Sequence, residues 1–342
     1  MNRTNGPIAS SSEEASDADW GRSLAICLGT LALGVGLLLM LMVLVDPYDS
    51  GRLGLLGIRG TDDAFPSTAK VSQARDPQFD SAIFGNSTGQ LIRPDALSKA
   101  TGKQFVQLVI PGSPPAGQLA VLEFFLRHHT HAGSLVVVID DPWCARSSAP
   151  APDDVFPYWL YGYSTLRYMR HLLNWKAVEL AGRRIKIGLG WGTRNREDGF
   201  DDYERALPAG KHQPDETPRS QSSQYHGPVN HLFPYKDSLW SVIDRLAPDV
   251  GLVLVVPPNF HTILPVPGAR EAREREACNA AFRALIDGRP GSNLIDYRID
   301  NDLTRDPKNF VDLIHYRSEI ARQIEAGIIA SLTWGQAAQI NF

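Results

Sequence analysis

The residues best suited to covalent chemistry are a serine and a histidine that lie far apart in the sequence. Ser87 stands in the small-residue segment Gly85–Gly89, just after the apolar run Ser81–Phe84, and His315 ends the segment Asp312–His315. A serine hydroxyl is a weak nucleophile at neutral pH, so it needs a histidine to accept its proton and nearby donors to hold the developing negative charge. We therefore predict that Ser87 is a nucleophile and that His315 activates it.

Both segments also have a purely structural interpretation. The sequence Gly-Asn-Ser-Thr-Gly has a good turn composition, since Gly and Asn tolerate positive φ and Ser and Thr bond to the local backbone. Asp312 and His315 are three positions apart, a spacing that local capping also produces, so the alternative role of Asp312 is to cap the last helix. The elements around the two segments have to decide between these interpretations.

Short apolar runs alternate with helical patterns through most of the chain after residue 80. Runs that are apolar on both faces indicate strands buried in a parallel sheet. We expect such strands at Ser81–Phe84, Phe105–Ile110, Leu135–Ile139, Gly251–Val256 and Asn293–Ile295. Helical spacing of apolar residues is found at 93–101, 118–128, 269–286 and 318–329. This alternation predicts a three-layer α/β/α domain with a mainly parallel, flavodoxin-like sheet.

The candidate residues follow the strands at one end of this expected sheet. In a parallel sheet the loops after the carboxyl ends of the strands converge, and ligands bind there. Ser87 follows the first strand, Gly112 the second, and Asp140 and Asp141 the third, while His315 precedes the last helix. We therefore expect these loops to meet at one edge and to form a site.

In the order of its elements the chain resembles the SGNH hydrolase superfamily, also called the GDSL esterases, over roughly Ser81–Ala330. The shared features are a Gly-x-Ser loop after the first strand, a glycine after the second, and Asp-x-x-His just before a final helix. In detail the chain resembles the membrane-anchored envelope branch, whose members are similar to proteins that O-acylate extracellular polysaccharides and cell-wall polymers. The Val-Asp-Pro-Tyr sequence after the long apolar segment strengthens that resemblance.

The resemblance implies a role for each of these residues. Ser87 would be the nucleophile, His315 its general base, and Asp312 the carboxylate that orients the imidazole. The backbone N–H groups of Ser87 and Gly112 would stabilise the oxyanion. The implied partners are a carbohydrate polymer or an acyl donor, together with proteins of envelope biosynthesis, and neither a cofactor nor a metal ion is implied.

The third strand departs from the family pattern. The family usually places an asparagine there as a further oxyanion donor, whereas this chain has Asp140 and Asp141, and the first loop reads Gly-Asn-Ser in place of the familiar Gly-Asp-Ser. An ionised carboxylate cannot donate a hydrogen bond, and its charge opposes an oxyanion. The departure implies a slow enzyme or another donor, for which the candidates are Asn86 and Asn259. Alternatively, Asp140 or Asp141 binds sugar hydroxyls.

Aromatic residues are further candidates for contact with a carbohydrate. Trp143 and the aromatic residues between 158 and 163 can stack on sugar rings, although such clusters more often belong to a core. Trp191 lies in an irregular insertion at 181–234, which also holds the histidines of His226–His231. A long insertion in a compact domain is usually a functional loop or a disordered one, and its aromatics and histidines favour a lid over the site.

A long uncharged segment precedes the α/β pattern. Leu24–Val45 carries no charge over 22 residues, enough for a helix to cross a hydrocarbon core of about 30 Å. A cleaved secretory signal would have a shorter apolar core of about 7–15 residues and a small-residue cleavage site. We therefore expect a disordered tail at 1–22, a single-pass anchor at 23–46 in the inner membrane, a stalk at 47–78 and an extracytoplasmic domain at 79–342.

Composition excludes several classes of protein. The chain of 342 residues has a formal net charge of −4 and no long basic run, so it offers no surface for nucleic acid. Its three cysteines, Cys27, Cys144 and Cys278, are widely spaced and odd in number. We therefore expect neither a disulfide framework nor a cysteine metal site.

These features predict a membrane-anchored serine esterase or O-acyltransferase that acts on an envelope polysaccharide through an acyl group on Ser87. The alternative is a catalytically inactive protein of the same fold that binds carbohydrate or scaffolds a polysaccharide assembly. The aspartates after the third strand favour this alternative. A flavodoxin-like nucleotide binder is disfavoured, because the first turn lacks a glycine-rich phosphate loop.

Overall fold

A five-stranded sheet, parallel throughout, lies at the centre of the domain. The structure is a computed structural model that describes residues 11–62, 64–145, 152, 155–207, 214 and 232–334. The strands run in the order β2-β1-β3-β4-β5. Their bounds are Ser81–Gly85 (β1), Phe105–Val109 (β2), Ser134–Val138 (β3), Gly251–Val256 (β4) and Asn293–Asp296 (β5). The predicted α/β fold with a parallel sheet is therefore confirmed.

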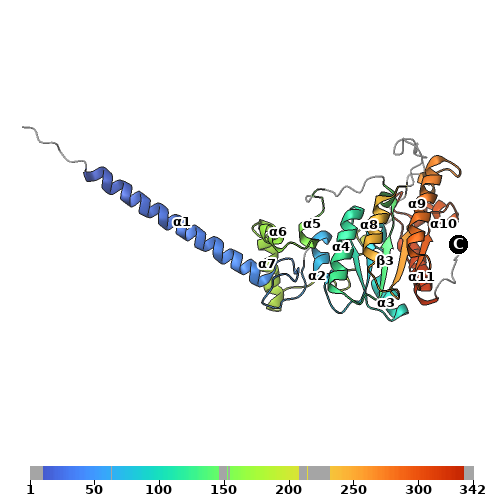
Figure 1. Ribbon diagram of the computed structural model, residues 1–342, viewed down its shortest axis with the longest axis horizontal. Helices are drawn as coiled ribbons and strands as arrows, with labels where there is room; N and C mark the ends of the chain where they lie inside the picture. The colour runs from blue at the N-terminus through green and yellow to red at the C-terminus, as the bar shows by residue number, and fades with distance from the viewer. Residues whose placement is uncertain are drawn as a thin grey trace, which may run out of the picture.

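Helices cover both faces of the sheet, because successive side chains of a strand point to opposite sides. Phe84 packs with the core on one side and Ile83 with the core on the other. The first core lies under α4 (Pro115–His128), α8 (Pro234–Ile243) and α9 (Arg270–Ile286), and the second under α3 (Pro94–Thr101) and α11 (Ser318–Trp334). The arrangement has three layers (Figure 1).

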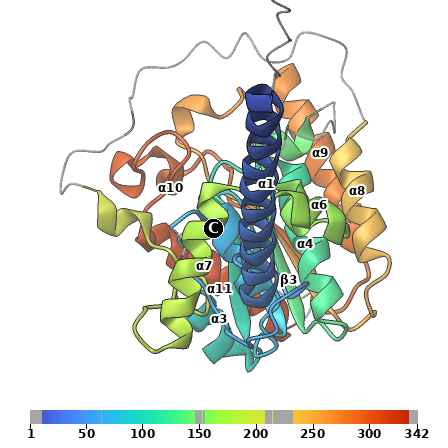
Figure 2. The same cartoon turned by 90° about the vertical axis from the view of Figure 1, so that its left-hand side faces the viewer.

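Short helices complete the domain. They are α2 (Pro66–Ala74), α5 (Tyr158–Tyr161), α6 (Thr165–Arg170), α7 (Trp175–Gly188) and α10 (Asp302–Arg305). Single 3₁₀ turns are η1 (Ser87–Gly89), η2 (Asp141–Cys144), η3 (Tyr203–Ala206), η4 (His261–Ile263) and η5 (Pro307–Asn309). In Figures 1 and 2, α6 and α7 lie at the end of the domain from which the first helix projects.

The first helix, α1 (Ser11–Val45), extends from the domain as a long rod (Figure 1). It begins inside the expected tail, of which residues 1–10 lie outside the described part. Its apolar portion, Trp20–Val45, is long enough to cross a membrane, and most of that portion is exposed. This is consistent with a membrane anchor or a signal sequence.

The segment after α1, expected as a stalk at 47–78 that wraps onto the domain, packs against it. Tyr48 is part of the core, and α2 packs against α4 and β2. The buried carboxylate of Asp49 pairs with Arg184 of α7 at 3.0 Å and with Arg75 after α2. The partners of the segment lie far away in the chain, so the sequence pattern did not identify them.

A disulfide joins Cys144 of η2 to Cys278 of α9, with the Cα atoms 5.8 Å apart. The expectation of no disulfide was therefore wrong. The two cysteines are 134 positions apart, and only the packing of η2 against the helical layer brings them together. Cys27, on α1, is free and exposed.

The expected insertion at 181–234 is partly regular structure. Its first residues complete α7, and residues 189–207 form a strap along the edge of the sheet. The backbone N–H of Gln107 in β2 donates to the carbonyl of Asp198 at 2.7 Å, and Gly199 lies so close that a Cβ there would stand 2.3 Å from the Gln107 oxygen. The strap therefore covers the edge of β2. His226–His231 lies outside the described residues.

Candidate active site

The candidate nucleophile stands on a tight turn at the carboxyl end of β1. Asn86 caps this turn, because its side-chain oxygen accepts from the backbone N–H of Thr88 at 3.1 Å. The flanking glycines let the turn lie flat against β3. A Cβ on Gly85 or Gly89 would stand 2.9 or 3.0 Å from the side chain of Val138. Packing and turn chemistry together thus hold Ser87 at the edge of the sheet.

The candidate base stands on a second tight turn, just before α11. An antiparallel bridge between Phe310 and Tyr316 closes the turn, and the N–H of Val311 donates to the carbonyl of His315 at 2.7 Å. The loop after β4 supports it, since the N–H of Phe260 donates to the carbonyl of Leu313 at 2.9 Å. The imidazole is therefore carried by a braced loop.

The two turns meet. Nε2 of His315 lies 2.8 Å from Oγ of Ser87, and Nδ1 of the same ring lies 2.7 Å from Oδ2 of Asp312. An ionised carboxylate only accepts hydrogen bonds, so the Nδ1 atom carries the proton of the neutral ring and Nε2 is free to accept from the serine. The structure thus joins the three residues in one hydrogen-bonded chain.

Asp312 is held in its ionised form. Burial opposes ionisation, but hydrogen bonds from the His315 ring and from the backbone N–H groups of Ile314 and His315 outweigh it and lower the pKa of Asp312 to about 2. These bonds all lie within the turn, whereas α11 begins later, at Ser318. Asp312 therefore organises the histidine turn and does not cap the last helix.

Two tyrosines that the sequence pattern did not single out connect the turns. Tyr316 is fully buried, and its hydroxyl donates to the carbonyl of Thr88, beside the nucleophile. Tyr203, at the end of the strap, donates its hydroxyl to the carbonyl of Tyr316, and its ring packs in a T-shaped arrangement with that of His315, with centroids 5.7 Å apart. The sequence offers one signal for Tyr316, because this residue directly follows the candidate base His315.

The loops that leave β1 and β2 carry two backbone donors. These strands are parallel neighbours, with Gly85 opposite Val109, so the turn at Ser87 and the loop at Gly112 leave the same edge of the sheet. Gly112 has a positive φ of 71°, which favours glycine. Within the described residues, the backbone N–H groups of Ser87 and Gly112 have no hydrogen-bond acceptor.

Asp140 stands at the end of β3, beside the nucleophile turn. Its Oδ2 accepts from the side-chain amide of Asn86, while its Oδ1 is buried and has no hydrogen-bond partner in the described part of the chain. Burial raises the pKa of Asp140 to about 6, against the lowering effect of the Asn86 hydrogen bond. Asn86 is consequently held on both sides, by its own turn and by this carboxyl.

The remaining polar candidates are Asp141 and Asn259, whose described contacts are with residues other than Ser87. Asp141 forms ion pairs with Arg298 and, at 3.5 Å, with Arg275, so its charge is already compensated. Asn259 is buried in the loop after β4, next to Phe260, which braces the histidine turn.

The two candidate tryptophans are not part of this cluster. Trp143 is fully buried, its Nε1 donates to Gln118 at 3.2 Å, and its ring packs on Phe282 of α9. The expectation that Trp143 contacts substrate was therefore wrong, because the η2 turn directs the ring into the core. Trp191 is exposed beyond the end of α7, and its N–H donates to the carbonyl of Lys186.

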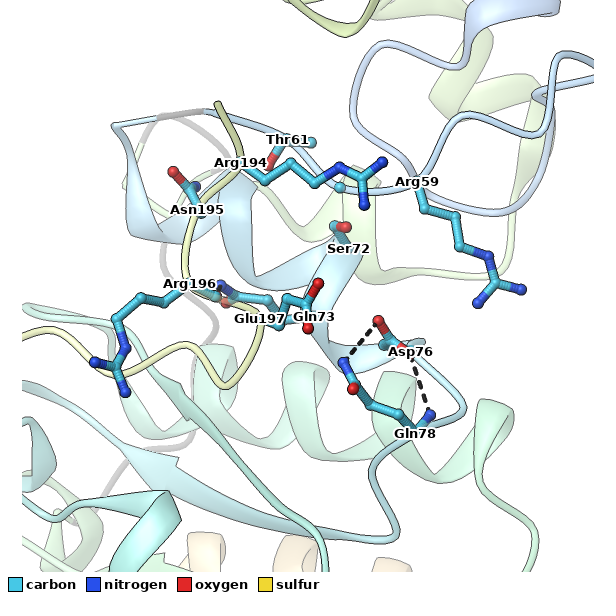
Figure 3. Close-up of a pocket in the computed structure, with 11 residues that line it drawn as sticks. Arg59, Thr61, Ser72, Gln73, Asp76, Gln78, Arg194, Asn195, Arg196 and Glu197 are labelled. Carbon is cyan, nitrogen blue, oxygen red and sulfur yellow. Dashed lines mark hydrogen bonds between the residues drawn. The ribbon is translucent and has the colours of Figure 1, made fainter. Parts of the chain in front are cut away.

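Hollows occur near the site and beside the segment that links α1 to α2. One of about 240 Å³ reaches Pro111, next to Gly112, and is lined by Gln90 and the buried Lys70. Another, of about 310 Å³, lies between α2 and the strap (Figure 3). Ser87 lines neither of these two hollows, but the first extends to the loop that carries the second backbone donor.

No model of a known protein family matches the chain, and no curated protein matches its sequence at a significant level.

Proposed function

We propose that the protein is a serine esterase or O-acyltransferase of the SGNH hydrolase type. The observation that carries this proposal is the hydrogen-bonded chain from Ser87 through His315 to Asp312, at 2.8 and 2.7 Å. A nucleophile, a base and a carboxylate in this relation are recognised by their roles and not by their order in the sequence. The position of the chain at the carboxyl edge of a parallel sheet supports the same interpretation.

The first half-reaction transfers an acyl group to the protein. Oγ of Ser87 attacks the carbonyl carbon of an ester while its proton moves to Nε2 of His315, and the carbonyl oxygen becomes an oxyanion. The ionised Asp312 stabilises the imidazolium. The backbone N–H groups of Ser87 and Gly112 are the donors for the oxyanion. When the intermediate collapses, the leaving alcohol takes the proton from His315, and an ester remains on Ser87.

The second half-reaction releases the acyl group. An acceptor hydroxyl loses its proton to His315 and attacks the acyl carbon, and Ser87 regains a proton as it leaves. Water as the acceptor gives hydrolysis, and a sugar hydroxyl gives O-acylation. The hollow that reaches Pro111 is a candidate space for either an acyl chain or a sugar.

The exposed apolar helix and the disulfide support a place on the outer side of the cytoplasmic membrane. Disulfides persist in oxidising compartments and are rare in the cytosol, and Cys144 and Cys278 form one here. Cleavage of α1 near its end would remove Met42 and Val45, which belong to the core, so a retained anchor is favoured. We therefore propose that the substrate is an envelope polysaccharide.

Covalent labelling of the full chain in detergent micelles tests the nucleophile directly. A fluorophosphonate should add once, on the peptide that contains Ser87. Ser87→Ala should abolish the label, His315→Ala should slow it strongly, and Ser241→Ala, on the exposed face of α8, should have no effect. With a chromogenic acetyl ester, Ser87→Ala should lose about 10³-fold or more in kcat/KM. Equal labelling of the wild type and Ser87→Ala would refute the proposal.

A second function, polysaccharide binding without turnover, is favoured by Asp140. Its carboxyl stands where a further oxyanion donor is expected, and in the ionised form it opposes the charge of the intermediate. A binding protein would show no fluorophosphonate adduct but would retain affinity for an acylated polysaccharide. Ser87→Ala would then leave that affinity and any cellular phenotype unchanged.

A further inference from the structure

The surface of the domain at the end from which α1 projects has several exposed apolar side chains. Leu55, Trp175 and Trp191 are 81%, 82% and 79% exposed. Leu56, Leu166 and Leu173 are also more than half exposed. We call these six residues the α1-side surface. Figures 1 and 2 show that α6 and α7 lie beside α1, at the end of the domain from which it projects.

This surface is continuous with the end of the apolar helix. The N–H of Gly54 donates to the carbonyl of Val43 at 2.9 Å, and the N–H of Leu56 donates to the carbonyl of Leu44 at 3.3 Å. The loop that carries Leu55 is therefore bonded to the last turn of α1. Helix α7 packs against the same part of α1. The loop that carries Leu55 and helix α7 therefore both adjoin α1.

The same elements carry a strong excess of positive charge. One of the seven Arg and Lys residues between Pro157 and Asn195, the buried Arg184, is neutralised by Asp49, and the other six stand against one acidic residue, Glu179. That glutamate is already paired with Arg183 at 2.6 Å. By contrast, the whole chain has a net charge of −4. The positive charge is thus concentrated at one end of the molecule.

A hollow at the border of this region adds one more cation, Arg59, beside Arg194, which is already among the seven. It is lined by Arg59 and Arg194; in Figure 3 the guanidinium of Arg194 lies above Ser72 and that of Arg59 lies to the right, above Asp76. Within the described residues neither arginine has a carboxylate partner. A surface that combines tryptophan and leucine with arginine and lysine is typical of proteins that bind the headgroup interface of an anionic bilayer.

We propose that the α1-side surface docks on the anionic phospholipid leaflet from which α1 emerges. The side chains of Leu55, Trp175 and Trp191 lie at the depth of the headgroups, and Arg170, Lys186 and Arg194 contact lipid phosphates. This inference rests on the proposed role of α1 as a membrane anchor, but not on the proposed chemistry at Ser87.

Spin labels on the full chain in vesicles measure the depth of each position. Wild-type protein labelled at the native Cys27 reports whether α1 is in the membrane. In a Cys27→Ser background, Trp175→Cys and Trp191→Cys report the docked surface, and Arg283→Cys, exposed on α9, is the control. The ratio of collision rates with oxygen and with a water-soluble nickel chelate rises with depth.

In vesicles that contain phosphatidylglycerol, we expect this ratio at positions 175 and 191 to be several-fold higher than at 283. The difference should shrink in pure phosphatidylcholine and at high salt. The combined variant Arg170→Glu, Lys186→Glu and Arg194→Glu should abolish the difference. The matched variant Lys99→Glu, Arg273→Glu and Arg283→Glu, read at positions 175 and 191, should preserve their high ratio.

Three results would overturn the inference. If the label at Cys27 lies in hydrocarbon while 175 and 191 are as aqueous as 283, docking fails and the anchor stands. If the label at Cys27 is itself aqueous, the anchor fails and docking fails with it. If 175 and 191 become shielded only as the ratio of protein to lipid rises, the surface contacts a second protein copy. None of these results bears on fluorophosphonate labelling of Ser87.

Discussion

At the scale of single residues, the proposed chemistry depends on Asp140, whose charge would affect how well the site stabilises an oxyanion. It stands beside the nucleophile turn, where its carboxyl accepts the amide of Asn86. With a pKa of about 6, it is protonated in acid and ionised at neutral pH. The protonated form is able to donate a hydrogen bond, as the acid of an oxyanion hole does. The ionised form would repel the oxyanion of the proposed intermediate.

We predict that Asp140→Asn increases kcat/KM at pH 8 by about 10²-fold, the size of one oxyanion contact. The ratio of variant to wild-type activity should rise as the pH increases through about 6, because only the wild type gains a charge there. At pH 5 the two proteins should be nearly equal. Initial rates with an acetyl ester between pH 5 and pH 8 give this ratio.

Asp141→Asn is the control for Asp140. Asp141 already faces Arg298 and Arg275, so its removal should not reproduce the dependence on pH. If the ratio of Asp140→Asn to wild-type activity stays constant between pH 5 and pH 8, the carboxyl of Asp140 does not act on the reacting centre.

Tyr316 shows how one residue sets the distance between the two turns. We predict that Tyr316→Phe lowers kcat about tenfold with little change in KM, because the histidine turn loses its bond to the carbonyl of Thr88. The carbonyl left without a donor should also lower the free energy of unfolding by about 1–3 kcal/mol. Steady-state kinetics and chemical denaturation measure the two effects. A change in KM alone would contradict this role.

At the scale of elements, the disulfide fastens the η2 turn to α9. We predict that replacing both Cys144 and Cys278 with alanine lowers the free energy of unfolding by about 2–5 kcal/mol, since the bond closes a very long loop. Thermal denaturation of wild type and variant, each with and without a reductant, is the measurement. A reductant should affect only the wild type. Equal stability of the two proteins under oxidising conditions would contradict the prediction.

The sheet and its site loops were predictable from the sequence because their signals are local. The run Gly251–Val256 has the bounds of β4, and Phe105–Ile110 differs from β2 by one residue. Such strands are buried on both faces and are therefore continuously apolar. Parallel pairing then brings the turn at Ser87 to the same edge as the loop that carries Gly112.

The features that the sequence did not reveal depend on contacts between distant segments. Trp143 looks the same in sequence whether its ring faces a sugar or the helical layer. The pairing of Cys144 with Cys278 and the ion pair of Asp49 with Arg184 exist only after three layers have packed. Tyr203 reaches His315 because the strap follows the edge of β2, and no periodicity marks such a path.

At the scale of the whole molecule, α1 and the domain share one core. Met42 and Val45 of α1 are buried, and Asp49 neutralises the buried Arg184. We predict that deletion of residues 1–37 leaves a folded, water-soluble domain with an unchanged thermal midpoint. Deletion of residues 1–49 should lower that midpoint sharply, because an unpaired buried charge alone costs about 3–5 kcal/mol.

Thermal denaturation of the two shortened chains tests the shared core. The point variant Asp49→Ala in the full chain separates the charge from the lost apolar contacts, and it should reproduce part of the effect of the longer deletion. Equal midpoints for both deletions would show that the end of α1 is an independent tether.

The direct bonding of α1 to the domain also bears on substrate selection. A catalytic domain on a flexible linker can place its active site at many different distances from the membrane surface. Here the junction has no slack, since the loop after α1 is bonded back onto the last turn of the helix. If α1 spans a bilayer, the distance between Ser87 and the bilayer surface is fixed. Such an enzyme would select among chemically identical hydroxyls by their distance from the membrane. It would therefore modify a growing polymer only within a narrow range of that distance.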